Sequence, residues 1–247
     1  MRRARREDLP TLSNLWARCF GDSVAYVDAF WARFYDAFQV FVNEDCTAMA
    51  VVMPMRWQER SAAYLYAVCT APKVRGRGLC RTLIAEIEAE LCRQGISYAL
   101  LVPAEPHLFA FYEKMGYETV FFRSSRSGGA ADAPKARRIS PAEYGALRQA
   151  QLCGGVEYPL CLLELQETFG ALYAVPGGCA AAEREDAGWL IRELLTDEPD
   201  AALASLAAEL ETASLTAWQP GAESPHGMAK SLDGAPLKQS YLGLSFG

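Results

Sequence analysis

Residues 73–78 combine three cations and two glycines in a short turn between an apolar run and a helical pattern. The apolar, β-prone run at 64–70 predicts a buried strand, and apolar residues recur at helical spacing over 79–91. The first amides of a helix lack partners within it and lie at the positive end of its dipole. Glycine lets the backbone approach an anion, so the turn predicts a phosphate site. Its residues are Lys73, Arg75, Gly76, Arg77, Gly78, Leu79 and Cys80.

The spacing of this turn separates it from two common phosphate motifs. A Walker A loop needs Gly-Lys-Ser/Thr, and the G-x-G-x-x-G pattern of dinucleotide sites fails at Arg81. The alternative to an anion site is an ordinary strand-to-helix turn with solvated arginines. Two glycines and three cations directly after a strand favour the anion site.

The turn and a downstream segment resemble two motifs of the GNAT (GCN5-related) N-acetyltransferases. Residues 75–80, Arg-Gly-Arg-Gly-Leu-Cys, are similar to the family's acetyl-CoA loop, Arg/Gln-x-x-Gly-x-Gly/Ala, and depart from it at Cys80. Residues 111–117, Phe-Tyr-Glu-Lys-Met-Gly-Tyr, are similar to its Leu-Tyr-Glu-Lys-x-Gly-Phe segment. The resemblance covers residues 1–123. It implies an N-acetyltransferase that uses acetyl-CoA on a primary amine.

The resemblance also assigns roles to single residues. Backbone amides near Val68, Cys69 and Thr70 are expected to bind the pantetheine arm and the acyl carbonyl. Tyr112 is the expected general acid, because a tyrosine is protonated at neutral pH and this position faces the CoA sulfur in the family. Glu105 is an expected cofactor contact, at a position where many relatives carry asparagine.

The general base is not identified by the sequence. Some two-part relatives use the carboxylate at the end of the chain, which makes Gly247 a candidate, and a chain of water molecules is an equal alternative. Cys69 and Cys80 raise the possibility of a covalent acyl-enzyme, with a lowered thiol pKa at Cys80 near the helix start. Without a histidine partner, direct transfer in a ternary complex is preferred.

Two other classes of function are weighed against the enzyme. The first is a non-catalytic CoA-binding regulatory module, which would keep residues 73–80 and lose the acid or the base. The absence of an obvious base keeps this alternative open, whereas Tyr112 counts against it. The second is a pure interaction protein, which the cationic glycine turn disfavours.

Composition limits the partners and the compartment. The 247 residues are 51% hydrophobic, as in packed globular proteins, with no apolar run of the roughly 20 residues that cross a bilayer. The basic N-terminus lacks an apolar signal core, so we expect a cytoplasmic protein that does not bind membranes. Eight scattered cysteines without a C-x-x-C pair predict free thiols, and two histidines give little support for a metal.

Charge is placed unevenly along the chain. Residues 1–123 carry 15 Lys and Arg against 14 Asp and Glu, whereas the whole chain has a formal charge of −6. An acidic C-terminal part argues against nucleic-acid binding. The expected partners are therefore acetyl-CoA and a small-molecule or peptide amine, and the oligomeric state is left open.

Hydrophobic periodicity predicts the element order βαα-βββ-α-β-α-β over residues 1–123 and a similar order afterwards. With the resemblance, this implies an α+β fold (an α/β mixed sheet), in which a central mixed sheet is flanked by helices, followed by a degenerate second copy. The expected parts are a catalytic domain at 1–125, a linker at 126–138 and a degenerate domain at 139–247. In the second part we expect a helix at 159–169, strands at 171–175, 179–185, 188–196 and 215–219, a helix at 201–210, an irregular stretch at 220–237 and a strand at 241–246.

In the second copy, a phosphate loop would lie at residues 197–200, which are Asp-Glu-Pro-Asp. Carboxylates there would repel a phosphate, so we expect one CoA per chain.

Overall fold

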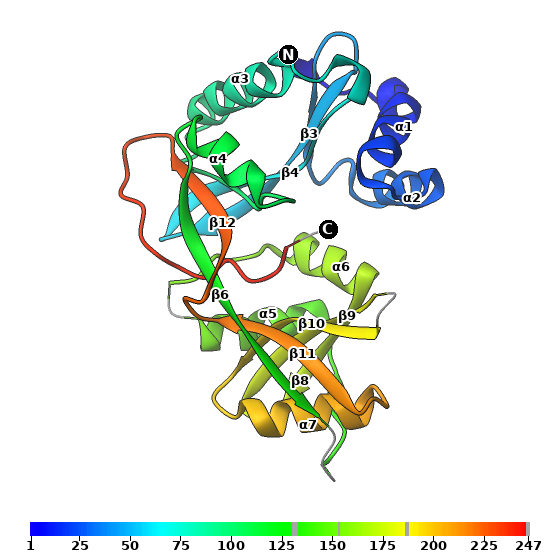
Figure 1. The fold of residues 1–247 in the computed structure, drawn as a ribbon, viewed down its shortest axis with the longest axis vertical. Helices are drawn as coiled ribbons and strands as arrows, with labels where there is room; N and C mark the ends of the chain where they lie inside the picture. Colours follow the sequence, from blue (N-terminus) through cyan, green and yellow to red (C-terminus); the bar gives the residue numbers. More distant parts are fainter. Residues whose placement is uncertain (130–132, 153, 186–187, 246–247) are drawn as a thin grey trace.

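The computed structural model describes residues 1–129, 133–152, 154–185 and 188–245 (Figure 1). The N-terminal half, from β1 to β6, contains β1 (Arg2–Arg3), α1 (Leu9–Phe20), α2 (Val24–Phe34), β2 (Gln39–Val42), β3 (Ala48–Trp57), β4 (Arg60–Thr70), α3 (Leu79–Arg93), β5 (Tyr98–Leu101), α4 (His107–Glu113) and β6 (Glu118–Gly129), with 3-10 turns at Arg6–Asp8 and Pro72–Val74. The C-terminal half, from β7 to β12, contains β7 (Arg137–Arg138), α5 (Pro141–Gln151), α6 (Leu160–Phe169), β8 (Gly170–Val175), β9 (Gly178–Glu185), β10 (Gly188–Thr196), α7 (Pro199–Glu209), β11 (Ser214–Pro220) and β12 (Ser224–Ser231).

The twelve strands of the described residues form one mixed sheet, in the order β1-β2-β3-β4-β5-β12-β6-β11-β10-β9-β8-β7. In each half, four strands pair antiparallel in sequence and the fourth pairs parallel with the fifth across a helix. The sixth strands are exchanged, because β12 pairs with β5 and β6 pairs with β11. Figure 1 shows β6 running from one half into the other.

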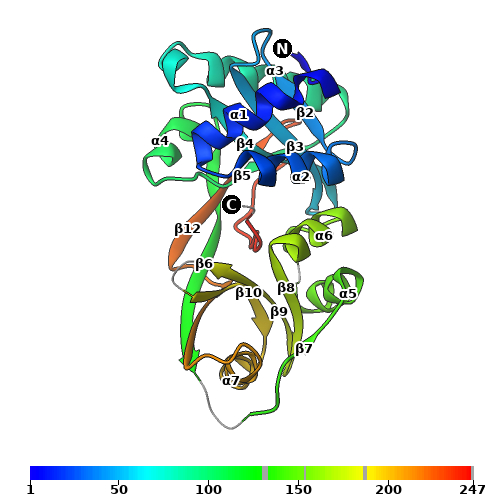
Figure 2. The same cartoon turned by 90° about the vertical axis from the view of Figure 1, so that its right-hand side faces the viewer.

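Helices cover both faces of the sheet in each half. In the N-terminal half, α1 and α2 pack on one face and α3 and α4 on the other, because alternate strand residues such as Met49 and Ala50 point to opposite faces. In the C-terminal half, α5 and α6 pack on one face and α7 on the other. Figure 2 shows α7 inside the curve of the lower strands. The C-terminal half thus repeats the layers of the N-terminal half.

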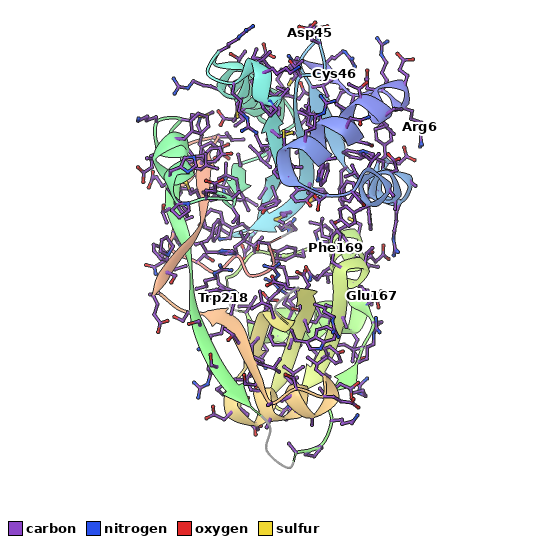
Figure 3. All side chains as sticks on the ribbon, turned by 45° about the vertical axis from the view of Figure 1, so that its right-hand side comes forward. Arg6, Asp45, Cys46, Glu167, Phe169 and Trp218 are labelled. Carbon is purple, nitrogen blue, oxygen red and sulfur yellow. The ribbon has the colours of Figure 1, made fainter. Side chains whose placement is uncertain are left out.

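The two halves also meet through helices and the end of the chain. Phe169 at the end of α6 lies below the N-terminal half in Figure 3, and its ring centroid is 5.5 Å from that of Tyr26 on α2. Leu162 and Leu165 of α6 and Leu242 of the C-terminal tail belong to the same apolar core as α1 and α2. The tail over residues 241–245 therefore lies between the halves.

The predicted fold class, a mixed sheet flanked by helices, is confirmed, and the second copy repeats the first in strand order. Three local predictions are wrong. Residues 224–231 form β12 instead of an irregular stretch, residues 126–129 extend β6 into the predicted linker, and residues 241–245 form no strand. Helix α5 was not predicted. The domain limits at 125 and 138 stay a prediction, although β6 crosses the first of them.

No helix among the described residues is both long enough and apolar enough to span a bilayer.

We predict that His226 makes the fold sensitive to acid. His226 is buried on β12 and its Nε2 lies 3.2 Å from the carbonyl oxygen of Gly243. Burial, with the nearby Arg123 charge, lowers its pKa from 6.5 to about 4. As the pH falls below 6.5, the unfolded chain binds a proton on His226 at a higher pH than the folded chain does. The contribution of neutral His226 to the free energy of unfolding is therefore complete above pH 6.5 and is lost progressively as the pH falls to about 4. The loss is about 3 kcal/mol.

Chemical denaturation of the native chain and of His226→Gln at several pH values measures this effect. The native chain should lose about 3 kcal/mol more than the variant between neutral pH and about pH 4. Parallel curves for the two proteins would show that His226 does not titrate in this range.

Candidate active site

The site begins where two parallel strands separate. Strand β4 pairs with β5 only from Ala62 to Tyr64, opposite Tyr98 to Leu100, whereas β4 continues to Thr70. The separation leaves backbone groups at the end of β4 free of the neighbouring strand on that side. A cleft therefore opens between the ends of β4 and β5.

A β-bulge in β4 shapes this cleft. Met49 and Val51 of β3 are two residues apart, but their partners on β4, Cys69 and Tyr66, are three apart. The extra residue carries Ala67 into a left-handed conformation with φ 48°. Such a backbone costs about 1–3 kcal/mol for a residue other than glycine. The bulge turns the backbone near Val68 towards the cleft, and Val68 lines it.

Three adjoining cavities form one continuous groove along these strands. The loop cavity, at the start of α3, has a volume of about 370 Å³. The middle cavity has about 540 Å³, and the inner cavity, between β4 and β5, about 270 Å³. The loop and middle cavities share Thr70, Arg75, Cys80 and Phe111, whereas the middle and inner cavities share Phe20, Val68, Ala104, Leu108 and Tyr112.

The glycines of the loop leave the cavity open. Gly76 and Gly78 have φ values of 77° and 79°, which L-residues rarely adopt, and a Cβ on either would have no atom within 4 Å. Gly78 is the N-cap of α3, so the free amides of that helix point to this space. The loop thus has the geometry for an anion at a helix start.

Arg75 is fixed at the edge of the loop. Its Nε donates to the carbonyl oxygen of Thr70 at 3.0 Å. The hydroxyl oxygen of Thr70 is buried and has no hydrogen-bond partner among the described residues, at the junction of the loop and middle cavities. An unpartnered buried hydroxyl at this position fits a polar ligand group in the groove.

The structure brings most of the predicted cofactor residues together. The residues that line the groove are Val68, Cys69, Thr70, Arg75, Gly76, Gly78, Leu79, Cys80 and Glu105. Lys73 and Arg77 are exposed and lie outside the linings of these three cavities, whereas Arg81, which was not predicted, lines the loop cavity. Glu105 sits at the rim, where its carboxylate is 3.1 Å from Nδ1 of His107.

Tyr112 lines the wall that the middle and inner cavities share. It lies on α4 and is buried to 7% exposure in the core formed with α3. Burial, and then the nearby Cys80 thiol, raise the pKa of Tyr112 above its usual 10. Tyr112 therefore stays protonated at neutral pH and can donate a proton into the groove.

Three cysteines reach the middle cavity from different elements: Cys19, Cys69 and Cys80. Burial raises the pKa of Cys80 to about 11, so the predicted activation of this thiol at the helix start is wrong. Cys19, which was not predicted, is the activated thiol. A hydrogen bond from Cys69 and the guanidinium of Arg75 lower the pKa of Cys19 to about 6.

Among the described residues, the inner cavity has aromatic walls and one carboxylate. Its lining includes Trp16, Phe20, Tyr64 and Tyr66, which were not assigned to the site from the sequence. The carboxylate of Asp22 accepts from Nε1 of Trp16 at 2.7 Å. Ser245 also lines this cavity. Gly247, the candidate base, lies outside the described residues.

Within the described residues, no group of three or more His, Cys, Asp or Glu side chains is arranged to hold a metal ion.

Comparison with protein families finds one match, in the N-terminal part of the chain. Residues 1–120 match the model of the acetyltransferase (GNAT) domain. A search of curated proteins gave no match.

Solved structures share the fold over nearly the whole chain. A GCN5-related N-acetyltransferase from Kribbella flavida has a TM-score of 0.69 at 19% identity, covering 93% of this chain and 70% of its own. One from Anabaena variabilis has a TM-score of 0.70 at 19% identity, covering 93% and 72%. A putative acetyltransferase from Pyrococcus horikoshii has 0.68 at 12% identity, covering 99% and 93%. The similarity therefore includes both halves.

We predict that Gly78→Asp weakens CoA binding at the loop. The new carboxylate would enter the open space where an anion is expected, and like charges repel. We expect CoA affinity, measured by calorimetry, to fall at least about tenfold, or about 1.4 kcal/mol.

Gly95→Asp is the matched control. Gly95 ends α3 at the opposite end of the helix with φ 74°, and a Cβ there also meets open space. This variant carries the same backbone strain and charge away from the groove, so it should keep native affinity. Equal affinities for both variants would contradict an anion site at Gly78.

Proposed function

We propose that this protein is an N-acetyltransferase that moves the acetyl group of acetyl-CoA to a primary amine, because residues 1–120 match the model of the acetyltransferase (GNAT) domain. The observation that carries the proposal is the single groove from the glycine loop, past Tyr112, to the aromatic inner cavity. A long donor would fit this groove with its phosphate end at the glycine loop and its thioester end at Tyr112. Direct attack within one ternary complex follows, because donor and acceptor would meet at Tyr112.

The donor half of the groove would be held mainly by backbone groups. Amides at the start of α3 would bind the pyrophosphate, with Arg75 and Arg81 beside it. Backbone groups at the bulge, near Val68, would bind the pantetheine arm and polarise the thioester carbonyl. The buried hydroxyl of Thr70 would gain a polar partner from the same arm.

The acceptor would enter at the inner cavity. Aromatic faces attract cations, and the carboxylate of Asp22 adds negative charge beside them. An amine must be neutral to attack, so a proton has to leave before the carbon–nitrogen bond forms. The base stays a prediction: the Gly247 carboxylate and a water chain are both retained, and Ser245 brings the tail to this cavity.

Collapse of the tetrahedral intermediate would break the carbon–sulfur bond. The oxyanion re-forms the carbonyl, the sulfur leaves as a thiolate, and Tyr112 supplies its proton. Tyr112 is protonated at neutral pH, so its proton is available when the thiolate forms.

The alternative is a CoA-binding regulatory module without turnover, and one experiment separates the two. Purified protein is mixed with acetyl-CoA and a panel of primary amines, and the release of free CoA thiol is followed. Amine-dependent thiol release with an acetylated product supports the enzyme. CoA binding without release for every amine in the panel supports the module.

We predict that Tyr112→Phe lowers kcat by about 10–100-fold, which reaches the lower limit of the ~10²–10⁴-fold contribution of general acid–base steps. The change removes the donated proton and little volume, so CoA affinity should be kept. Tyr117→Phe is the control, because Tyr117 is also buried in this core and its ring centroid is 5.8 Å from that of Tyr112, yet it lies outside the groove linings. Full activity of Tyr112→Phe would assign the tyrosine a packing role only.

The role of Gly247 is tested by extending the chain. Two residues added after Gly247 move the carboxylate from its native position without altering the tail contacts of Leu242 and Leu244 with Tyr158. We expect turnover to fall by about tenfold or more while CoA affinity stays unchanged. Native turnover in the extended chain would leave the water chain as the base.

A further inference from the structure

Two thiols from different elements meet in the middle cavity. Cys19 lies near the end of α1 and Cys69 near the end of β4, and both line the cavity. Each of the two thiols also shifts the pKa of the other, downwards at Cys19 and upwards at Cys69. Fifty residues of sequence separate the two, so their contact is a product of the packing of α1 on β4.

Arg75 completes this cluster from the glycine loop. Its Nη2 lies 3.8 Å from the sulfur of Cys19, while its Nε is held by the carbonyl oxygen of Thr70. As a thiol, Cys19 donates to that same carbonyl oxygen at 3.6 Å. A guanidinium and a thiol donor on one sulfur stabilise its thiolate form, which is the nucleophile in thiol chemistry.

The two thiols differ in solvent exposure and in the direction of their pKa shifts. Cys19 is half-buried, and its neighbour Phe20 is 44% exposed at the mouth of the same cavity. Cys69 is buried at 7% exposure, and its pKa is raised by the hydrogen bond to Cys19 and by burial. Cys19 is therefore placed to react first, with Cys69 behind it as a second thiol.

We propose that Cys19 and Cys69 form a thiol–disulfide exchange site in the cofactor groove, whose reactant is the disulfide of CoA. The choice of CoA disulfide rests on the proposed function, because a groove that binds CoA would bind one CoA moiety of its disulfide in the same way. The exchange chemistry itself rests only on the cluster.

The exchange has two steps. The Cys19 thiolate attacks one sulfur of CoA disulfide, a Cys19–CoA disulfide forms, and one CoA leaves as a thiolate that takes a proton from water. Cys69 then loses its proton to water and attacks the Cys19 sulfur, which releases the second CoA as a thiolate. Two protein thiols are oxidised to one disulfide, and one CoA disulfide is reduced to two CoA thiols.

The closed disulfide would switch off the site. It ties α1 to β4 within the middle cavity and removes the thiolate that Arg75 faces. The groove cannot hold the Cys19–CoA adduct and acetyl-CoA at once. Acetyl transfer and exchange are therefore mutually exclusive, and a rising ratio of CoA disulfide to CoA lowers the activity.

Intact-mass analysis of the reduced full-length chain tests the proposal. With CoA disulfide at neutral pH, the native chain should lose two hydrogen masses and release two CoA thiols. Cys69→Ser should stop at a stable CoA adduct, mapped to Cys19 by peptide analysis. Cys19→Ser should form neither product in the groove, and Cys92→Ser, which removes an exposed thiol on α3, should behave like the native chain.

Two competitors separate cluster chemistry from cofactor recognition. Glutathione disulfide at the same concentration should react with Cys19 at least about tenfold more slowly, and saturating acetyl-CoA should slow the reaction of CoA disulfide to a similar degree. Equal rates for the two disulfides, or no protection, would overturn recognition of CoA disulfide. An unreactive Cys19, or faster labelling of Cys92, would overturn the exchange site. The reactions with both disulfides are followed by the mass of the chain, so their outcome does not depend on whether the protein transfers acetyl groups.

Discussion

The exchange of β6 and β12 is the constraint on which the rest of the fold depends. Each half supplies five strands of its own, and its sixth position is filled by the strand of the other half. Residues 228–231 of β12 complete the sheet beside β5, while residues 123–129 of β6 complete it beside β11. An open sheet edge exposes unpaired amides and carbonyls, so each half would leave such an edge if it folded alone. The two halves therefore form one continuous sheet, and the groove that begins at β4 and β5 is stabilised by a strand that comes more than a hundred residues later.

The fold could be predicted where local chemistry and tertiary structure agree. Strand β10 was placed correctly over 188–196, and the helical pattern after Gly78 became α3, because their burial follows a simple period. Strand β12 has the sequence Ser-Pro-His-Gly-Met-Ala-Lys-Ser, in which proline, glycine and lysine disfavour a strand. It forms because β5 and β6 pair with it on both sides. Helix α5 did have a signal: Ser140 accepts from the amide of Glu143, and Ser-Pro-Ala-Glu is a typical helix start.

The site could be predicted only where a motif fixes the backbone. The glycines at 76 and 78 adopt the left-handed conformations that their identity allows, and the loop cavity lies beside them. Ala67 gives no such signal, since alanine rarely has positive φ, and its bulge is imposed by the pairing of β4 with β3. Cys19 and Asp22 come to the groove from the end of α1, through packing that no local pattern encodes. The residues of the glycine loop were therefore placed beside a cavity, whereas Cys19 and the aromatic walls of the inner cavity were missed.

The C-terminal half keeps the layers of the first half but has a different task. Within it, Arg148 and Glu193 form a buried ion pair at 2.8 Å, and such a pair is costly unless its remaining hydrogen bonds are satisfied. They are satisfied partly by the tail, because Arg148 donates to the carbonyl oxygen of Leu242 at 3.1 Å. Gly243 follows with φ 83°, and a Cβ there would overlap Glu193, so the tail fits this pair closely. The remaining partners are Tyr144 and Val156.

Residues 197–200 follow β10 as the glycine loop follows β4, and they carry carboxylates where the loop carries cations. The buried Arg148 holds the tail, and Ser245 of the tail lines the inner cavity of the other half. The C-terminal half thus carries carboxylates at the position of the cationic glycine loop, and its buried ion pair holds the tail beside the inner cavity.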